Sequence, residues 1–209
     1  MLLSLKRLCE AEKRLILARK LFDGLDDKVR RAQVDETLAQ LHLADNKIDL
    51  AERAILRAVE GLGNGGEDAH LAEVLSTHGV ILCRLGRHRE AKRVLERSNR
   101  MAENCGDREG AGRALLIVIE EMFEELDDAE RLEIRDRLDM LLSHSQQRLT
   151  LERLRTCQER MAKSPGIKRL ARAVNSQYPI TQTFSWSPDT YEILRCCHFG
   201  LVPRRDETL

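Results

Sequence analysis

Small and apolar residues recur at steps of three and four along the first hundred residues, which is the spacing of one face of an α-helix. Many of these positions also agree at a fixed offset of 40 residues. The matching sets are Ala11, Ala51 and Ala91; Leu15, Ile55 and Leu95; Ala18, Ala58 and Ser98; Ala32 and Ala72; Val34 and Val74; Thr37 and Thr77; and Ala39 and Gly79. The pattern predicts a helical unit that is repeated and packs against its own copies.

Glycine and aspartate residues mark the ends of the predicted helices. Gly24, the glycines of residues 61–66 and Gly106 suit the left-handed residue that ends a helix. The aspartates suited to cap the following helices are Asp26, Asp68 and Asp107. Shorter breaks at residues 45–47 and 86–88 divide each copy into a helix pair. The predicted helices span residues 4–23, 27–44, 48–62, 68–85, 88–104, 107–125, 127–142 and 147–162. We expect an all-α fold of antiparallel helix pairs that stack in sequence as a solenoid.

The last quarter of the chain has a different character. All four prolines lie there, and most of the aromatic residues do as well. Because a helix interior excludes proline, a domain boundary is predicted near residues 163–166. We therefore expect a helical repeat domain over residues 1–163 and an irregular or disordered tail over residues 164–209. Ser187 and Pro188 suit the start of one short helix within this tail.

One stretch of the chain resembles the framework of tetratricopeptide repeats. The stretch runs from Gly79 through Leu82 and the Leu-Gly-Arg-His-Arg-Glu-Ala turn of residues 85–91 to Leu95, and it is similar to the pattern G…Y…L-G-x-x-x-E-A…F. Leucine replaces the usual aromatic residues at positions 82 and 95, and the copies exceed the usual length of about 34 residues. The framework positions are Ala11, Ala51, Ala91, Gly79, Gly86 and Leu95.

The resemblance covers residues 10–160 and includes a group of bacterial tetratricopeptide proteins. Some members of that group carry a C-terminal Fis-type helix-turn-helix and resemble transcriptional or signalling regulators. The segments that carry the resemblance are 32–37, 110–114 and 141–145, whereas the tail contains no recognisable helix-turn-helix. The resemblance implies a right-handed α-α superhelix that begins with the second helix of a pair.

The resemblance also implies a binding surface. In the family, the first helix of each pair lines a concave groove that accepts a peptide or a helix. The residues expected to face this groove are Gln33, Glu36, Gln40, Glu73, Ser76, Val80, Cys83, Arg84, Arg113 and Glu120. The set is mixed in charge and partly apolar, and it lacks the Lys and Asn with which chaperone-binding members hold a C-terminal carboxylate. A helix or an extended segment of another protein is the expected ligand.

Composition excludes several classes of protein. The 35 basic and 35 acidic side chains balance, and no apolar run approaches the roughly 18 residues that would span a bilayer. Lys6 and Arg7 interrupt the apolar N-terminus too early for a secretion signal, so we expect a cytoplasmic protein without a membrane partner. The six cysteines form no C-x-x-C pair, and we expect buried free thiols.

Motifs for catalysis or cofactors do not withstand inspection. Residues 61–66 match G-x-G-x-x-G, but a predicted helix precedes them where a dinucleotide-binding loop requires a strand. The run Cys196-Cys197-His198 lacks the ligand spacing of a zinc site. His42 and His78 fall on or beside the packed face, and the spacing of the other histidines suggests no catalytic group. We therefore expect no enzyme activity, cofactor or metal.

Two runs of charge suggest alternatives. Acidic residues crowd positions 120–133, and basic residues dominate positions 148–172. The basic run offers a surface for nucleic acid. However, Arg148, Glu152, Arg155 and Glu159 lie at helical steps of three and four, which is typical of a solvated helix face.

The leading hypothesis is a non-catalytic adaptor that binds a protein or peptide in bacterial regulation or signalling. One alternative is a nucleic-acid-associated transcriptional regulator that acts through residues 148–172 and the tail. The other is a fragment of a larger regulator. Self-association through an exposed helical face at the N-terminal end, giving a homo-oligomer, is a further expectation.

Overall fold

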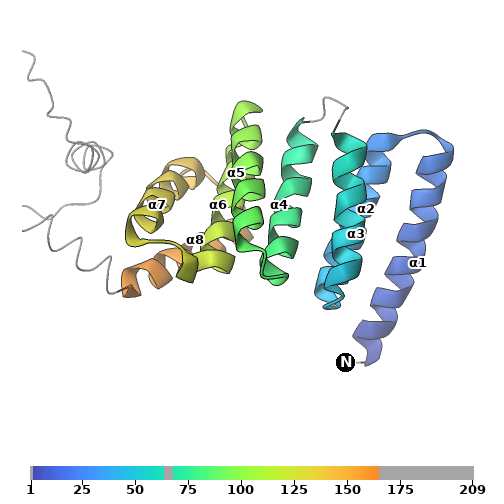
Figure 1. The fold of residues 1–209 in the computed structure, drawn as a ribbon, viewed down its shortest axis with the longest axis horizontal. Helices are drawn as coiled ribbons and strands as arrows, with labels where there is room; N and C mark the ends of the chain where they lie inside the picture. Colours follow the sequence, from blue (N-terminus) through green and yellow to red (C-terminus); the bar gives the residue numbers. More distant parts are fainter. Residues whose placement is uncertain (1, 64–67, 165–209) are drawn as a thin grey trace, which may run out of the picture. The chain divides into compact units, whose positions relative to one another are not determined.

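In the computed structural model, residues 2–63 and 68–164 are described, and they form eight α-helices, one short 3₁₀ helix and no strand (Figure 1). The elements are α1 (Leu2–Gly24), α2 (Lys28–Ala44), α3 (Ile48–Leu62), α4 (Asp68–Arg84), α5 (His88–Asn104), α6 (Arg108–Met122), η1 (Phe123–Glu125), α7 (Asp128–Leu142) and α8 (Arg148–Lys163). The predicted all-α class is confirmed for this part of the chain, and most helix ends fall within two residues of the predicted positions.

The period of 40 residues reappears in the helix starts. Helices α2, α4, α6 and α8 begin at residues 28, 68, 108 and 148, and helices α3, α5 and α7 begin at residues 48, 88 and 128. Each copy is therefore a helix pair, with α2–α3 as the first copy, α4–α5 as the second and α6–α7 as the third. Helix α8 stands where the first helix of a further copy would begin.

The turns between helices use the left-handed backbone conformation at regular positions. The residues with positive φ are Asp26, Asn46, Gly86 and Gly106, at 52°, 57°, 74° and 76°. Aspartate and asparagine tolerate this conformation better than other residues with a side chain, and glycine adopts it without strain. The prediction that Gly24 would take this conformation is wrong, because Gly24 remains within α1 and the turn falls two residues later.

Aspartate caps start several helices. Asp107 accepts a hydrogen bond from the backbone N–H of Gly110 at 2.8 Å, as predicted. At α2 the cap is Asp27, which accepts from the N–H of Arg30 at 3.0 Å, and not the predicted Asp26. Asp26 is unavailable because the turn places it in the left-handed conformation, one residue before the cap.

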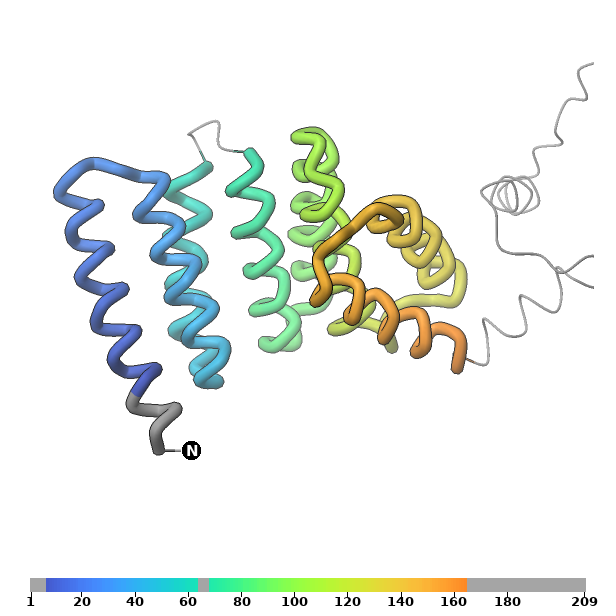
Figure 2. Tube along the Cα trace, turned by 180° about the vertical axis from the view of Figure 1, so that it is seen from behind, coloured from blue at the N-terminus to red at the C-terminus, as the bar shows by residue number. Residues whose placement is uncertain are grey.

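Consecutive helices from α1 to α7 pack against each other, and α2 also packs against α4, as α4 does against α6. Figures 1 and 2 show α2 and α3 one behind the other, between α1 and α4. The first helices of successive copies are therefore neighbours. The second helices, α3, α5 and α7, do not pack against one another to the same extent. This arrangement gives α2, α4 and α6 a common face.

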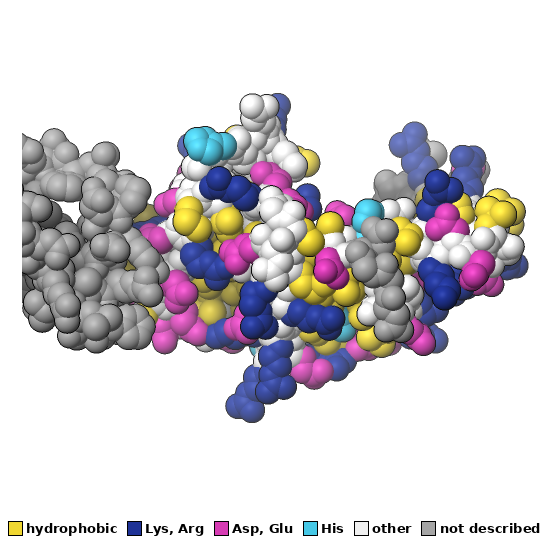
Figure 3. All heavy atoms as spheres, turned by 90° about the horizontal axis from the view of Figure 1, so that it is seen from above, with side chains coloured by type: hydrophobic (Ala, Val, Ile, Leu, Met, Phe, Trp, Pro, Cys, Tyr) yellow, Lys and Arg dark blue, Asp and Glu magenta, His cyan; other side chains and the backbone are white. Residues whose placement is uncertain are grey.

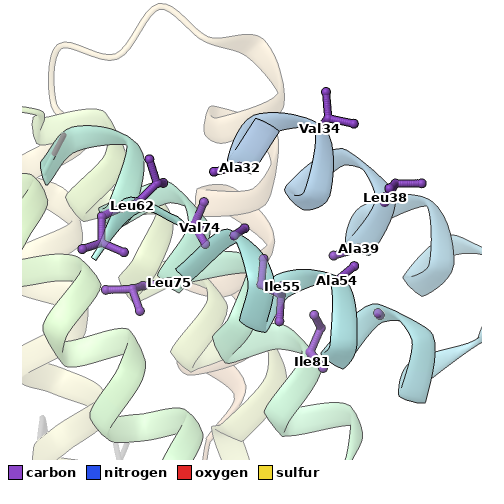
Figure 4. Close-up of a cluster of buried hydrophobic side chains, with 13 residues drawn as sticks. Ala32, Val34, Leu38, Ala39, Ala54, Ile55, Leu62, Val74, Leu75 and Ile81 are labelled. Carbon is purple, nitrogen blue, oxygen red and sulfur yellow. The ribbon is translucent and has the colours of Figure 1, made fainter. Parts of the chain in front are cut away.

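The core of the first two copies lies between α2, α3 and α4 (Figure 4). Ile55 and Ala39 are fully buried there, and burying a side chain such as Ile55 stabilises the fold by about 1.5–3 kcal/mol. In the second copy, a Cβ on Gly79 would lie only 2.4 Å from Cδ2 of Leu95. Glycine at position 79 is thus what lets α4 and α5 approach this closely.

The compact unit that contains these helices spans Met1–Met161, and a second unit comprises Ala162–Leu209. The predicted irregular tail, its short helix and the Cys196-Cys197-His198 run lie outside the described residues, apart from Ser164 at the start of the tail. No helix in the described part of the chain is both long enough and apolar enough to cross a bilayer.

The cysteines divide into two groups. Cys83 and Cys157 are buried as predicted, and burial raises the pKa of each thiol to about 11, so both are protonated at neutral pH. Cys9 and Cys105 are exposed, contrary to prediction. Cys105 follows the last residue of α5 in a turn, where no packed face is available to cover it.

Candidate functional site

Side-chain contacts join α2 to α4 along the common face of the first helices. The Thr77 hydroxyl donates a hydrogen bond to Oε1 of Glu36 at 2.9 Å, and the Gln33 amide nitrogen lies 2.5 Å from Nε2 of His70. Burial raises the pKa of Glu36, and the hydrogen bond from Thr77 partly opposes that shift. Glu36 and Gln33 therefore hold two helices together as well as lying on the predicted groove.

The same face continues from α4 to α6 through ion pairs. Arg84 on α4 contacts Glu121 on α6 at 2.8 Å, and Arg113 on α6 lies 4.0 Å from Glu73 on α4. The contacts fix long side chains that would otherwise move freely, so the surface is partly ordered before any partner binds.

From α6 the row of contacts reaches α8. Arg153 donates two hydrogen bonds to the carboxylate of Glu120, at 2.8 and 2.7 Å. Paired bonds of this kind between a guanidinium and a carboxylate are among the stronger polar contacts in proteins. We call the face formed by α2, α4, α6 and α8 the first-helix face.

The structure places the ten predicted groove residues on these helices with different exposures. Glu36 and Cys83 are buried; Gln33, Ser76, Val80, Arg113 and Glu120 are half-buried; and Gln40, Glu73 and Arg84 are exposed. A small hollow of about 20 Å³ lies beside Glu73, Ser76 and Arg113, which is room for one water molecule. The first-helix face is shallow at this point, so a ligand there would lie across it and not enter it.

A larger cleft, which the sequence did not predict, opens between α1 and α3 with α2 as its floor. Its volume is about 550 Å³. The residues that line it are Arg19, Lys28, Val29, Arg31, Asp35, Arg57, Glu60, Gly61 and Leu62. We call it the α1–α3 cleft. A cavity of this volume falls within the usual range for small-molecule sites.

One buried carboxylate organises the α1–α3 cleft. Asp35 is 1% exposed and lies between two arginines from different helices. Nε of Arg19 donates to both oxygens of Asp35, at 2.9 and 3.0 Å. Arg57 approaches Oδ1 of Asp35 through Nε at 3.0 Å and Nη2 at 2.8 Å. Asp35 thus ties α1 and α3 to α2 while both guanidinium groups remain partly exposed.

The sequence contained one signal for this cleft. At the offset of 40 residues, Asp35 corresponds to Leu75 and Arg19 corresponds to Val59. Both positions are charged at the junction of α1, α2 and α3 and apolar at the matching junction of α3, α4 and α5. Comparison of the unlike positions, in addition to the matching ones, would have drawn attention to this region.

Many side chains of the two charged runs are paired with a side chain of opposite charge, either one turn away on the same helix or on another helix. On α8, Arg148 and Arg155 pair with Glu152 and Glu159 one turn away, and Arg153 pairs with Glu120 of the acidic run. In the acidic run, further pairs are Glu121 with Arg84, Glu124 with Arg160, Glu125 with His88, Asp128 with Arg131 and Glu130 with Lys92. The described part of the basic run therefore offers nucleic acid fewer free positive charges than its composition suggests.

Phe123 helps to position Arg131 of α7 and Arg160 of α8. The guanidinium carbons of Arg131 and Arg160 each lie 4.2 Å from the centre of the Phe123 ring. Cation–π contacts of this kind are worth about 0.5–2 kcal/mol. Arg160 of α8 is therefore held in place by packing against the Phe123 ring, which is a structural role.

The N-terminal helix has an exposed apolar row. Leu17, Leu21 and Leu25 are 60%, 68% and 71% exposed. They lie one helical turn apart on or next to α1, beside the stripe of packed positions that includes Leu15 and Ala18. This row is the surface that the self-association hypothesis requires.

His42 is buried and His78 is half-buried, and burial lowers the pKa of both imidazoles, which fits the predicted packing role. Within residues 2–63 and 68–164, no three His, Cys, Asp or Glu side chains gather as metal ligands would. In the G-x-G-x-x-G match, Gly61 and Leu62 end α3, so a helix precedes the turn as predicted.

Lysine, arginine, aspartate and glutamate side chains are interspersed on the face shown in Figure 3, and they do not form patches of a single sign.

Comparison of the sequence with known protein families and with curated proteins, and of the structure with solved structures, finds no match.

Proposed function

We propose that this chain is a non-catalytic protein-interaction module, similar to tetratricopeptide adaptors, that binds a segment of another protein across the first-helix face. The observation that carries this proposal is the row of contacts that joins α2, α4, α6 and α8. A right-handed superhelix of the helix pairs is part of the proposal, because it would make this face concave. A cytoplasmic, regulatory setting is the context that we propose for it.

The chemistry of the face suggests how selectivity would arise. Val80 offers a half-buried apolar anchor, and Gln40 and Glu73 offer exposed polar groups on either side of the α2–α4 junction. In protein interfaces, a few desolvated anchors supply most of the affinity, while charges near the rim govern specificity and the rate of association. A partner helix or extended segment with complementary charge would fit this arrangement.

A matched pair of charge reversals tests this proposal. The full chain would be immobilised to isolate a stoichiometric protein partner, whose affinity is then measured by titration calorimetry. We expect Glu73→Lys on the first-helix face to weaken binding at least about tenfold, which corresponds to about 1.4 kcal/mol. Glu96→Lys, an exposed position on α5 outside this face, should change affinity by less than about twofold.

Three outcomes would contradict the proposal. Equal effects of the two reversals would place the partner elsewhere. A bound species that disappears on nuclease treatment, with affinity that falls steeply with salt, would favour the nucleic-acid alternative. The absence of any stoichiometric protein partner would remove the adaptor function.

A further inference from the structure

The α1–α3 cleft is the place where the packing of the first copy departs from that of the second. At the offset of 40 residues, four of its lining positions exchange polar or small residues for apolar ones. The pairs are Arg19 and Val59, Arg31 and Leu71, Asp35 and Leu75, and Gly61 and Met101. All four apolar members belong to the hydrophobic core or pack against it. Apolar side chains can therefore fill the space between helices arranged in this way, but in the first copy they do not.

The charged arrangement is a costly way to hold three helices together. Removing a carboxylate from water carries a large penalty, and replacing a buried ion pair by well-packed apolar residues is often neutral or stabilising. Asp35 is almost fully buried, and the cleft of about 550 Å³ above it remains unfilled by side chains. A purely structural role does not account for both features.

The charges of the cleft do not balance. Arg19 and Arg57 share the single carboxylate of Asp35. Arg31 on the cleft wall is paired with Asp23, whereas Lys28 is an exposed cation at the rim beside Glu60. The positive end of the α2 dipole is already occupied by the capping carboxylate of Asp27, so the excess positive charge of the cleft comes from its side chains.

Hydrogen-bond donors remain available inside the cleft. Within the described residues, Arg19 uses only its Nε–H toward Asp35, and Arg57 uses Nε and Nη2. Each guanidinium group carries five N–H donors in a planar fork that matches carboxylate and phosphate oxygens. The side chains of Arg19 and Arg57 are 34% and 43% exposed, so an incoming group can reach them.

We propose that the α1–α3 cleft binds a small-molecule oxyanion, a phosphate or carboxylate group, between Arg19 and Arg57 with Lys28 at the rim. Asp35 positions the two guanidinium groups from below. The buried Leu62 and the half-buried Val29 provide apolar walls for the remainder of the ligand. The site is separate from the first-helix face, and it does not depend on the protein-binding function proposed above.

The test is a titration of the full-length, ¹⁵N-labelled protein with sodium phosphate and, separately, with sodium succinate. Sodium chloride at the same ionic strength is the control. We expect saturable changes in the Nε–Hε resonances of Arg19 and Arg57 with a Kd of about 1 mM or tighter, and no saturable change with chloride. Saturation by phosphate alone or by succinate alone supports the site and identifies the anion class.

Matched variants distinguish the cleft from general attraction of anions. Arg57→Gln should weaken anion binding at least about tenfold, and Arg53→Gln, which removes the same charge from an exposed position on α3 outside the cleft, should leave it within about twofold. Lys28→Gln, at an exposed position, should weaken anion binding about threefold without affecting folding. This variant tests the site even if Arg57→Gln is poorly folded. Asp35→Asn should tighten binding, because it removes the competing carboxylate.

Two results would overturn the proposal. One is the absence of saturable changes with both anions in the wild-type protein. The other is an equal loss of binding in Arg53→Gln and in the two cleft variants, Arg57→Gln and Lys28→Gln. Circular dichroism of each variant would establish that the compared proteins are folded.

Discussion

The first and second copies have the same helix register, but the interiors of their helix junctions differ. In the second copy, Leu71 and Leu75 of α4 are 4% and 2% exposed and close the junction with hydrocarbon. In the first copy, Arg31 and Asp35 occupy the corresponding positions on α2, and a cleft remains. Repetition of the backbone therefore does not require repetition of the packing, and one junction can differ while its neighbour maintains stability.

The difference also separates two kinds of constraint. The small residues that match between copies, such as Ala51 and Ala91, are fully buried and govern how closely the helices approach. The residues that differ, such as Asp35 and Leu75, govern what fills the space between them. We take the first set as the basis of the fold and the second as the place to look for function.

The largest effect is expected when the charge of the first copy is placed in the second. Leu75→Asp would bury a carboxylate that lacks one of the two arginines that hold Asp35, because Val59 stands at the position of Arg19 and only Arg97 matches Arg57. We expect a loss of about 4 kcal/mol or more in the free energy of unfolding, measured by urea denaturation. Leu56→Asp, at a position 47% exposed on α3, should cost no more than about 0.5 kcal/mol. Similar losses for both would mean that the second junction is not the packed core described here.

A smaller effect is expected from removal of the carboxylate in the first copy. Asp35→Ala leaves Arg19 and Arg57 without their shared partner, but both arginines are partly exposed and can turn toward water. We therefore expect a loss of only about 1–2 kcal/mol in the free energy of unfolding, because solvent screens the remaining charges. A loss as large as that of Leu75→Asp would show that the ion-paired junction is as important to stability as the apolar one.

The histidines give the smallest effect, which depends on pH. His78 on α4 corresponds to Leu38 on α2, so His78→Leu makes the copies more alike. Burial lowers the pKa of His78 in the folded state, with opposing contributions from Glu52 and Glu90 and a further lowering by Arg87. A histidine with a lowered folded-state pKa contributes its full stability above its unfolded pKa near 6.5, and this contribution is lost as the pH falls.

The stability gained by His78→Leu over the wild type should therefore grow as the pH is lowered from 7.5 to 5.5, by an amount that thermal or urea unfolding can resolve. Taking the difference between the two proteins removes the contributions of other titrating groups, such as Glu36. A difference that is constant with pH would contradict the assigned direction of the pKa shift.

Much of the fold could be predicted from the sequence because the repeat determines the helix boundaries. The matching small residues and the turn residues every 20 or 40 positions were visible without coordinates. The errors were local: the left-handed turn residue is Asp26 and not Gly24, because sequence patterns do not distinguish which of several suitable residues takes that conformation.

The candidate sites were predictable to different degrees. The resemblance to tetratricopeptide repeats led to the expectation that Gln33, Glu73 and Arg84 line a groove, and these residues lie on α2 and α4. The resemblance was not enough to show that Glu36 would be buried against Thr77, since that depends on how two helices pack. The α1–α3 cleft was not predicted, because a cavity arises where long side chains such as Arg19 reach across a gap without filling it.

The central proposal is that the charges of the first junction bind a ligand, since apolar packing at the same positions would hold the helices together at least as well. The most direct measurement is a transplant of the second junction into the first, Arg19→Val, Arg31→Leu, Asp35→Leu and Gly61→Met, followed by urea denaturation and by the phosphate titration. We predict an unfolding free energy equal to or up to about 3 kcal/mol above that of the wild type, with anion binding abolished. A loss of more than about 2 kcal/mol, or anion binding that survives the transplant, would contradict the account.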